Sequence, residues 1–238
     1  MTPIFRFKKF DVQQEKSAMK VNTDSVLLGS WVRVENRNKI LDVGTGTGLI
    51  ALMMAQRTEQ AIIHGVEIEE GAYEEAKQNF AQASWSNRLV AFKSPIQEFD
   101  HEMAPYDLIV CNPPFFTGGT LSENQKRSSV RHTVKLPNNE LLRSVRRLLS
   151  KDGRFAVVLP YIEGLRFVEM AKTYGFCLFR QAEVRPRADR NVNRLLIEFG
   201  LHKCESLETT KIAIYKSDDS REYTSAYMEL TSAFYLKH

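Results

Sequence analysis

Hydrophobic residues follow two patterns along this chain. Short, continuously apolar runs bounded by turn residues are typical of strands buried in a parallel sheet. Runs of this kind predict strands at residues 39–44, 61–66, 89–92, 106–111, 153–159, 176–184, 195–201 and 212–215. Between them, apolar residues three and four positions apart are typical of amphipathic helices. This second pattern predicts helices around residues 23–32, 49–54, 69–77, 137–150, 162–174 and 227–236.

The alternation of strands and helices predicts an α/β fold with a doubly wound sheet, whose ligands bind beyond the carboxyl ends of the strands. A length of 238 residues fits one large domain of this class. We expect a single domain over residues 1–238, with an N-terminal arm and helix (1–34), a core (35–203), and a C-terminal strand and helix (204–238). The basic segment 185–194 lies between two predicted strands and is expected to form a hairpin.

A short polar and aromatic motif ends the fourth predicted strand. Asn112 is followed by Pro113 and Pro114, which lack an N–H group and cannot extend a sheet ladder. The Asn112 amide and the neighbouring carbonyls therefore point outward as hydrogen-bond acceptors for an NH2 group. Phe115 or Phe116 offers a flat face on which a planar group can stack. The alternative is a strand that ends in a proline turn over two core aromatics.

Two further strand ends carry candidate binding residues. Gly44, Gly46 and Gly48 form a turn into a helix, where glycines let the backbone approach a ligand and the helix start supplies N–H donors. Leu49 stands where the dinucleotide-binding fingerprint requires a glycine, so the spacing disfavours a pyrophosphate site. Glu67 ends the second strand, at a position where an acidic residue binds both hydroxyls of a ribose.

Composition and charge indicate the cellular compartment and the kinds of binding partner. The three cysteines are odd in number and far apart, which predicts free thiols in a reducing cytoplasm and argues against a metal site. No signal peptide and no apolar run of membrane-spanning length are visible. Residues 35–110 carry an excess of acidic side chains, and residues 120–154 an excess of basic ones. The acidic part suits a cationic small molecule and the basic part a polyanion, unless each is only a solvated surface.

Together these motifs resemble those of a known enzyme class. Ile40–Gly48, Glu67 and Asn112–Phe115 are similar to the first, second and fourth motifs of class I S-adenosylmethionine-dependent methyltransferases, in the form typical of members that methylate amino groups. Within that branch, Met19–Asp24 followed by Leu27–Gly29 resembles the tRNA1(Val) (adenine(37)-N6)-methyltransferases. The resemblance spans essentially the whole chain. It implies a Rossmann-like, mostly parallel seven-stranded sheet with short N-terminal and C-terminal additions.

The resemblance also implies a cofactor and a reaction. Asn112 and Pro113 would accept the two hydrogens of the N6 amine of an adenine in a tRNA anticodon loop, while Phe115 stacks on the base. Ser94 and Pro95 stand where many relatives have an acidic residue for the adenine of the cofactor. The implied S-adenosylmethionine-binding residues are Lys20, Thr23, Asp24, Asp42, Gly44, Gly46, Gly48 and Glu67, with the Ile96 backbone or Gln97 at the adenine.

The expected partner is tRNA, and the chain is expected to act as a monomer without a metal. The basic residues expected to contact RNA are Lys126, Arg127, Arg131, His132, Arg185, Arg187, Arg190 and Arg194. Three alternatives stay open: methylation of guanine N2 in rRNA, methylation of glutamine N5 in a protein, and a non-catalytic RNA-binding scaffold on the same fold. The preference for adenine over guanine rests on the resemblance of Met19–Gly29.

Overall fold

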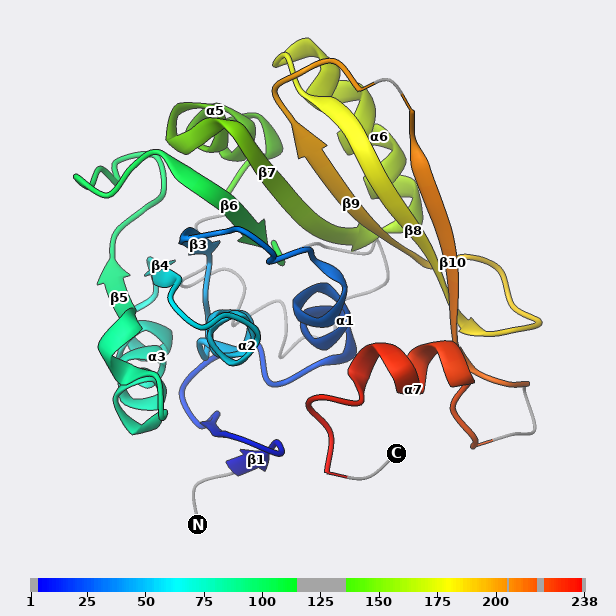
Figure 1. Cartoon of the computed structure of the whole chain (residues 1–238), viewed down its shortest axis with the longest axis horizontal. Coiled ribbons are helices and arrows are strands. Elements are labelled where there is room, and N and C mark those ends of the chain that lie inside the picture. Colours follow the sequence, from blue (N-terminus) through cyan, green and yellow to red (C-terminus); the bar gives the residue numbers. More distant parts are fainter. Residues whose placement is uncertain (1–3, 115–135, 205, 218–220, 237–238) are drawn as a thin grey trace, which may run out of the picture.

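The centre of the protein is a large mixed sheet (Figure 1). The computed structural model describes residues 4–114, 136–204, 206–217 and 221–236. Within these residues the sheet has eight strands in the order β10-β8-β9-β7-β6-β3-β4-β5, and only β9 runs antiparallel to its neighbours. The strands are β3 (Lys39–Val43), β4 (Ile62–Glu67), β5 (Leu89–Lys93), β6 (Tyr106–Cys111), β7 (Leu149–Pro160), β8 (Cys177–Arg187), β9 (Arg194–Gly200) and β10 (Glu208–Tyr215). The predicted doubly wound α/β fold is confirmed.

Helices cover both faces of the sheet. One face packs against α1 (Thr23–Trp31), α2 (Leu49–Arg57), α3 (Glu70–Gln82) and α7 (Ser225–Thr231). The other packs against α5 (Asn138–Leu148) and α6 (Tyr161–Thr173), and a 3-10 helix, η1 (Ser86–Arg88), precedes β5. Successive strand residues alternate between the two cores, as side chains of a buried strand must. No helix in the described part of the chain has the length and hydrophobicity of a bilayer-crossing segment.

The last strand differs from the expected architecture. The resemblance implied seven strands and placed residues 204–238 in an addition, whereas β10 pairs in parallel with β8 and extends the same sheet to eight. Its first four residues, 208–211, are polar and exposed. Because an edge strand is held by backbone hydrogen bonds along one side, it needs little apolar sequence, so the hydrophobic pattern indicated only residues 212–215.

The two ends of the described chain lie against each other. β1 (Ile4–Arg6) and β2 (Asp11–Gln13) form a separate two-stranded arm, within the region where the sequence predicted an N-terminal arm. In the turn between them, the Lys8 N–H donates to the Phe234 carbonyl at 2.8 Å. The Phe7 ring stacks on Tyr235 with 5.9 Å between ring centroids. The turn of the arm is therefore held by residues that follow α7, while β2 is held by α3, where Asn79 accepts from the Gln13 N–H and donates to the Gln13 carbonyl, both at 2.9 Å.

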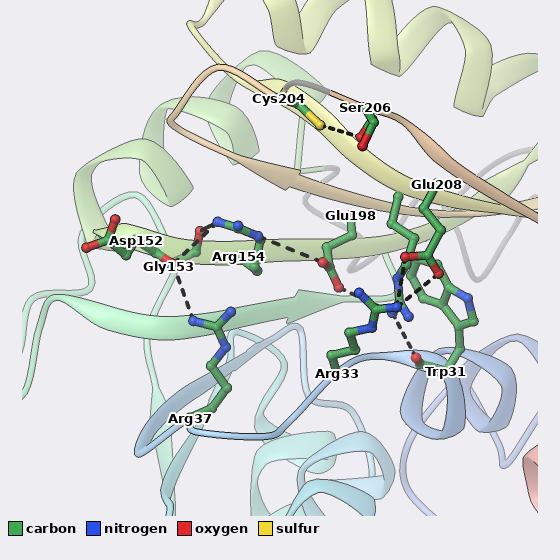
Figure 2. Close-up of polar contacts among 11 residues, drawn as sticks. Trp31, Arg33, Arg37, Asp152, Gly153, Arg154, Glu198, Cys204, Ser206 and Glu208 are labelled. Atoms are coloured by element: carbon green, nitrogen blue, oxygen red, sulfur yellow. Dashed lines mark hydrogen bonds and ion pairs between the residues drawn. The ribbon is translucent and has the colours of Figure 1, made fainter.

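A buried ion pair ties α1 to the antiparallel part of the sheet (Figure 2). Arg180 on β8 and Glu198 on β9 leave only 8% and 5% of their side chains exposed, and their Nη2 and Oε2 atoms are 3.3 Å apart. The Arg180 guanidinium lies 3.9 Å from the centroid of the Trp31 ring and donates to the Trp31 carbonyl at 2.9 Å. Because both charges are removed from water, each depends on the other for its stability.

Candidate active site

The three motifs of the sequence converge at one edge of the sheet. Val43 on β3 pairs with Val66 on one side and with Cys111 on the other. The residues that follow these three, Gly44, Glu67 and Asn112, therefore leave neighbouring strands at the same level. The carboxyl ends of β3, β4 and β6 thus bring together the glycine turn, the acidic residue and the amide, as the sequence predicted.

The glycine turn combines an open face with a tightly packed one. Gly44, Gly46 and Gly48 have φ values of 67°, 56° and 83°, a region that favours glycine. A Cβ atom on Gly44 would meet no atom within 4 Å, and one on Gly46 would meet only the Ser17 Oγ at 3.7 Å. A Cβ atom on Gly48 would lie 2.5 Å from the Phe80 ring. The first two glycines therefore leave space above the sheet, and the third allows α2 and α3 to pack.

The Glu67 carboxylate is fixed by backbone groups. It is 9% exposed, and its Oε2 atom accepts from the Gly46 N–H at 3.0 Å. Its Oε1 atom accepts from the N–H groups of Ile68 and Glu69 at 2.8 and 2.9 Å. A carboxylate has about four acceptor positions, so one remains, on Oε2. One ligand hydroxyl can donate to this position directly. A second hydroxyl can bind only if Glu67 gives up one of its hydrogen bonds to a backbone N–H group.

Asn112 is held so that its amide oxygen is unoccupied. The residue is 6% exposed, and its Nδ2 atom donates to the Ser25 Oγ at 2.8 Å and lies 3.7 Å from the Met19 Sδ. Its Oδ1 atom is buried and has no hydrogen-bond partner among the described residues. The opposite amide orientation would turn the oxygen toward the Met19 sulfur and leave the NH2 group unpaired. An unpaired buried acceptor is costly, which indicates that a donor from a ligand completes the site.

Comparisons with known proteins identify the family of the chain. A family model described as "Methyltransferase small domain" matches residues 16–179. A Vibrio campbellii protein named tRNA1(Val) (adenine(37)-N6)-methyltransferase is 43% identical over 98% of this chain and 95% of its own length. A Flavobacterium psychrophilum protein of the same name is 41% identical over 98% and 100%. The chain belongs to this methyltransferase family.

Solved structures support the fold of this methyltransferase. A predicted O-methyltransferase from Agrobacterium tumefaciens has a TM-score of 0.65 at 18% identity and covers 89% of this chain and 96% of its own. A glycopeptide N-methyltransferase, solved in complex with (S)-adenosyl-L-methionine, has a TM-score of 0.53 at 12% identity, with coverages of 69% and 87%. At these identities the likeness concerns the fold alone.

Ser25 contacts Asn112 in the candidate site, and the sequence did not reveal it. It lies in the first turn of α1, where the N-cap residue, Asn22, accepts from the Ser25 N–H at 2.9 Å. The Ser25 side chain is therefore fixed in the position from which its Oγ accepts from Asn112. The available signal was weak: Ser25 is a polar residue at the start of a helical run that is otherwise apolar and buried.

Replacing Ser25 by alanine is expected to lower the kcat of the methyltransferase by about three- to tenfold, the scale of one hydrogen bond. The Asn112 amide would lose the contact that orients it, so a larger part of its population would present the wrong atom. Single-turnover methylation of tRNA checks this, together with calorimetric affinity for S-adenosylmethionine, which is expected to be unchanged. Ser25→Thr, which keeps the hydroxyl, is expected to recover most of the rate. Equal losses in both variants would indicate a packing effect instead.

Asp42 lies behind the glycine turn and holds it together. Its Oδ2 atom accepts from the Thr45 hydroxyl at 2.6 Å and from the Ala51 N–H at 3.2 Å, while its buried Oδ1 atom has no partner among the described residues. Burial raises the pKa of Asp42 from 3.8 to about 7, and the negative charge of Glu67 adds to this shift. The two hydrogen bonds oppose it. The role predicted for Asp42 toward the cofactor stays a prediction.

The raised pKa of Asp42 predicts how the stability of the cofactor-free methyltransferase changes with pH. Between pH 3.8 and about 7 the folded state binds the Asp42 proton more tightly than the unfolded state does. Asp42 therefore lowers the free energy of unfolding as the pH rises through this window, by up to about 1.4 kcal/mol per pH unit. Asp42→Asn is expected to remove this fall in urea titrations, and the exposed Asp100→Asn to leave it in place. Parallel curves for wild type and Asp42→Asn would contradict the assignment.

The remaining residues predicted at the cofactor lie around the same edge. Thr23 is exposed at the start of α1, and Lys20 donates to the carbonyls of Gln14 and Glu15. Ile96 is 4% exposed and belongs to the core beside β5, whereas Gln97 is exposed. Asp24 forms an ion pair with Arg194, and their Oδ2 and Nε atoms are 2.9 Å apart. These placements leave the cofactor roles as predictions.

The predicted RNA-binding residues divide into two groups. The hairpin between β8 and β9 is confirmed, and it carries Arg185, Arg187, Arg190 and Arg194. Arg187 already makes a hydrogen bond within the protein, in which its Nη1 donates to the Ser217 carbonyl at 2.5 Å. Phe115, Lys126, Arg127, Arg131 and His132 lie outside the described residues. Of the acceptor motif, Asn112 and Pro113 are buried and Pro114 is exposed.

The described side chains form no group of three or more His, Cys, Asp or Glu residues able to hold a metal ion. Cys111 and the two other cysteines, Cys177 and Cys204, are free thiols.

Proposed function

We propose that this chain transfers a methyl group from S-adenosylmethionine to the N6 amine of adenine 37 in tRNA1(Val). The observation that carries the proposal is the buried Asn112 Oδ1 atom, which lacks a hydrogen-bond donor and stands one strand away from the glycine turn. The names of relatives that are 43% and 41% identical over nearly the whole chain specify the nucleotide. The proposal treats the whole chain as one methyltransferase domain.

The residues at the strand ends fit S-adenosylmethionine. The space above Gly44 and Gly46, which any side chain there would fill, suits the methionine part of the molecule. The free acceptor position on Glu67 suits a ribose hydroxyl. Asp42 and Asp24, with Lys20 and Thr23 nearby, would line the methionyl end, and Ile96 and Gln97 the adenine. When bound, S-adenosylmethionine supplies an electrophilic methyl group on a sulfonium.

The acceptor residues address the chemistry of an aromatic amine. The lone pair of adenine N6 is delocalised into the ring, so the amine is a poor nucleophile until it becomes pyramidal. The Asn112 Oδ1 atom and the Pro113 carbonyl would each accept one N6 hydrogen, which localises the lone pair and stabilises the positive charge that develops on nitrogen. Ser25 keeps the Asn112 oxygen turned toward the substrate. No general base is required, since the ammonium product loses its proton to water.

The proposed partner is a tRNA whose target base is unstacked. Bases in single-stranded loops are the ones that a protein extrudes at low cost, and Phe115 is proposed to stack on the extruded base. The arginines of the hairpin are proposed to contact phosphates. The proposed state is a monomer without a metal, located in the cytoplasm where tRNA is processed.

Methylation with labelled S-adenosylmethionine tests this function. The protein is incubated with unmodified total tRNA, and the RNA is digested to nucleosides. Label in N6-methyladenosine, located at position 37 of tRNA1(Val) by sequencing, is the expected result. Label in N2-methylguanosine moves the assignment to guanine, and label only on added protein moves it to glutamine. No transfer to any of them by a protein that binds the cofactor indicates a scaffold.

A further inference from the structure

An open cavity of about 610 Å³ lies beside the acceptor motif and has no assigned role. Its walls come from the end of β7, the first turn of α6 and the descending side of the β8–β9 hairpin, and include Pro160, Tyr161 and Arg194. A cavity of this size is large enough for a nucleotide-sized ligand.

The cavity begins close to the atom that would activate the substrate amine. Cys111 on β6 pairs with Val157 on β7, so Asn112 is level with Val158, and Pro160 lies two residues further along. With a rise of about 3.3 Å per residue and a strand spacing of about 4.8 Å, Pro160 lies about 8 Å from Asn112. A ligand in the cavity is therefore within one nucleotide of a base held at Asn112.

The lining of the cavity suits a nucleobase. Tyr161, Val192 and Ile162, which is 51% exposed, offer apolar and aromatic surface. The buried Nε atom of Arg185 in the wall has no hydrogen-bond partner among the described residues, and the exposed side chain of Asn193 adds an amide donor and an amide acceptor. The edge of a base, with donors and acceptors around a flat apolar ring, matches this combination.

Among the residues that the structure describes, the wall of the cavity carries no excess of positive charge that would select a phosphate. Glu163, in the first turn of α6, offsets the charge of Arg185, and the charge of Arg194 is balanced by its ion pair with Asp24. The same carboxylate accepts hydrogen bonds readily from the amino or imino groups of a base. The residues that line the cavity therefore favour the base of a nucleotide over its phosphate backbone.

The cavity is built in the folded protein and is connected to the acceptor site. The Tyr161 N–H donates to the Asn193 carbonyl at 3.1 Å, and the Asn193 N–H donates to the Val184 carbonyl at 2.9 Å. Arg194 reaches Asp24 at 2.9 Å, and Asp24 precedes Ser25, the residue that orients Asn112. A base in the cavity would thus bind to groups fixed relative to the reacting amine.

We propose that this cavity binds the base of a nucleotide directly adjacent to the methylated adenosine. The proposal rests on the function proposed above, and it adds a second recognised base to the flipped target. By binding the neighbour, the protein would hold the two nucleotides apart and keep the target unstacked. Base stacking and edge contacts in such a site are worth about tenfold or more in affinity.

The test combines protein variants with substrate variants. The substrates are full-length unmodified tRNAs, either intact or lacking the base of nucleotide 36 or nucleotide 38. The cavity variant is Ile162→Ala with Asn193→Ala, two exposed side chains whose removal leaves the core intact. Arg166→Met, on the exposed side of α6, is the matched control. Initial rates of labelled methyl transfer give kcat/KM for each combination.

At one of the two positions, loss of the base is expected to lower the kcat/KM of the wild type by about tenfold. Removal of the same base is expected to lower the kcat/KM of the cavity variant little further. In the control variant it is expected to lower kcat/KM by the same factor as in the wild type, so that the effects of the substitution and of the missing base multiply. If removal of the base at nucleotide 36 and at nucleotide 38 each lowers the kcat/KM of the cavity variant by the same factor as in the wild type, the proposal is overturned. Arg185→Gln repeats the test independently should the double variant bind S-adenosylmethionine poorly. Absence of transfer from wild type to intact tRNA would instead refute the proposed function.

Discussion

Replacing Asn112 by alanine is expected to lower kcat for tRNA methylation by about 10²- to 10³-fold, the range observed when one preorganised polar group is removed from a transition-state site. The substitution removes the unpaired Oδ1 atom, whose proposed contact strengthens only as charge develops on the amine. S-Adenosylmethionine affinity is expected to stay within about twofold, because the cofactor is proposed to contact the neighbouring strand ends. Single-turnover rates and calorimetric titration measure the two quantities.

The matched control for Asn112→Ala is Asn87→Ala, which alters an exposed asparagine in η1, next to the amino end of β5 and opposite the carboxyl strand ends that carry the site. This variant is expected to retain the wild-type rate. If Asn112→Ala also kept a rate close to that of the wild type, Asn112 would not be the acceptor. A parallel loss of cofactor affinity would instead indicate that the substitution had disturbed the glycine turn.

Replacing Arg180 by methionine is expected to lower the free energy of unfolding by about 3–5 kcal/mol, the range for breaking a buried ion pair on one side. Glu198 would stay buried, and its one remaining charged partner among the residues that the structure describes would be Arg154, whose Nε lies 3.9 Å from its Oε1. The carbonyl of Trp31 would also lose its donor. Urea denaturation followed by circular dichroism measures the change.

The double variant Arg180→Met with Glu198→Leu separates the charge from the packing. Removing both charges leaves no unpaired ion, so most of the lost stability is expected to return. If the double variant were as unstable as the sum of the single variants, the loss would come from packing around Trp31 and not from an unpaired buried carboxylate.

The sequence predicted the elements that depend on residues close together in the chain. The apolar runs of β3, β4 and β6 gave the strands, and the known behaviour of parallel sheets placed Gly44, Glu67 and Asn112 at one edge. The positive φ values at the glycines follow from the residue type and the turn into α2. These predictions need only neighbouring residues and a general rule of topology.

The sequence did not predict contacts between distant segments. Ser25 and Asn112 are separated by 87 positions, and the pairing of Asp24 with Arg194 spans 170. Neither pair has a local signature, because each depends on how α1 crosses the finished sheet. The placement of β10 at the edge was likewise hidden, since a polar edge strand resembles a loop in its hydrophobic pattern.

The contact between the N-terminal arm and the residues after α7 has a consequence for synthesis of the protein. Residues 7–10 leave the ribosome before any strand of the large sheet, and residues 232–235 leave after all of them. The turn of the arm therefore gains these contacts only after the sheet has been translated, whereas β2 can pack against α3 earlier. Beyond the arm, Glu75 on α3 accepts from the N–H groups of Lys16 and Ser17 at 3.0 and 2.9 Å, and the Ser17 Oγ atom is 3.7 Å from the position that a Cβ atom on Gly46 would take. The segment beside the glycine turn therefore depends on α3, and it can be fixed well before the arm acquires its last contacts.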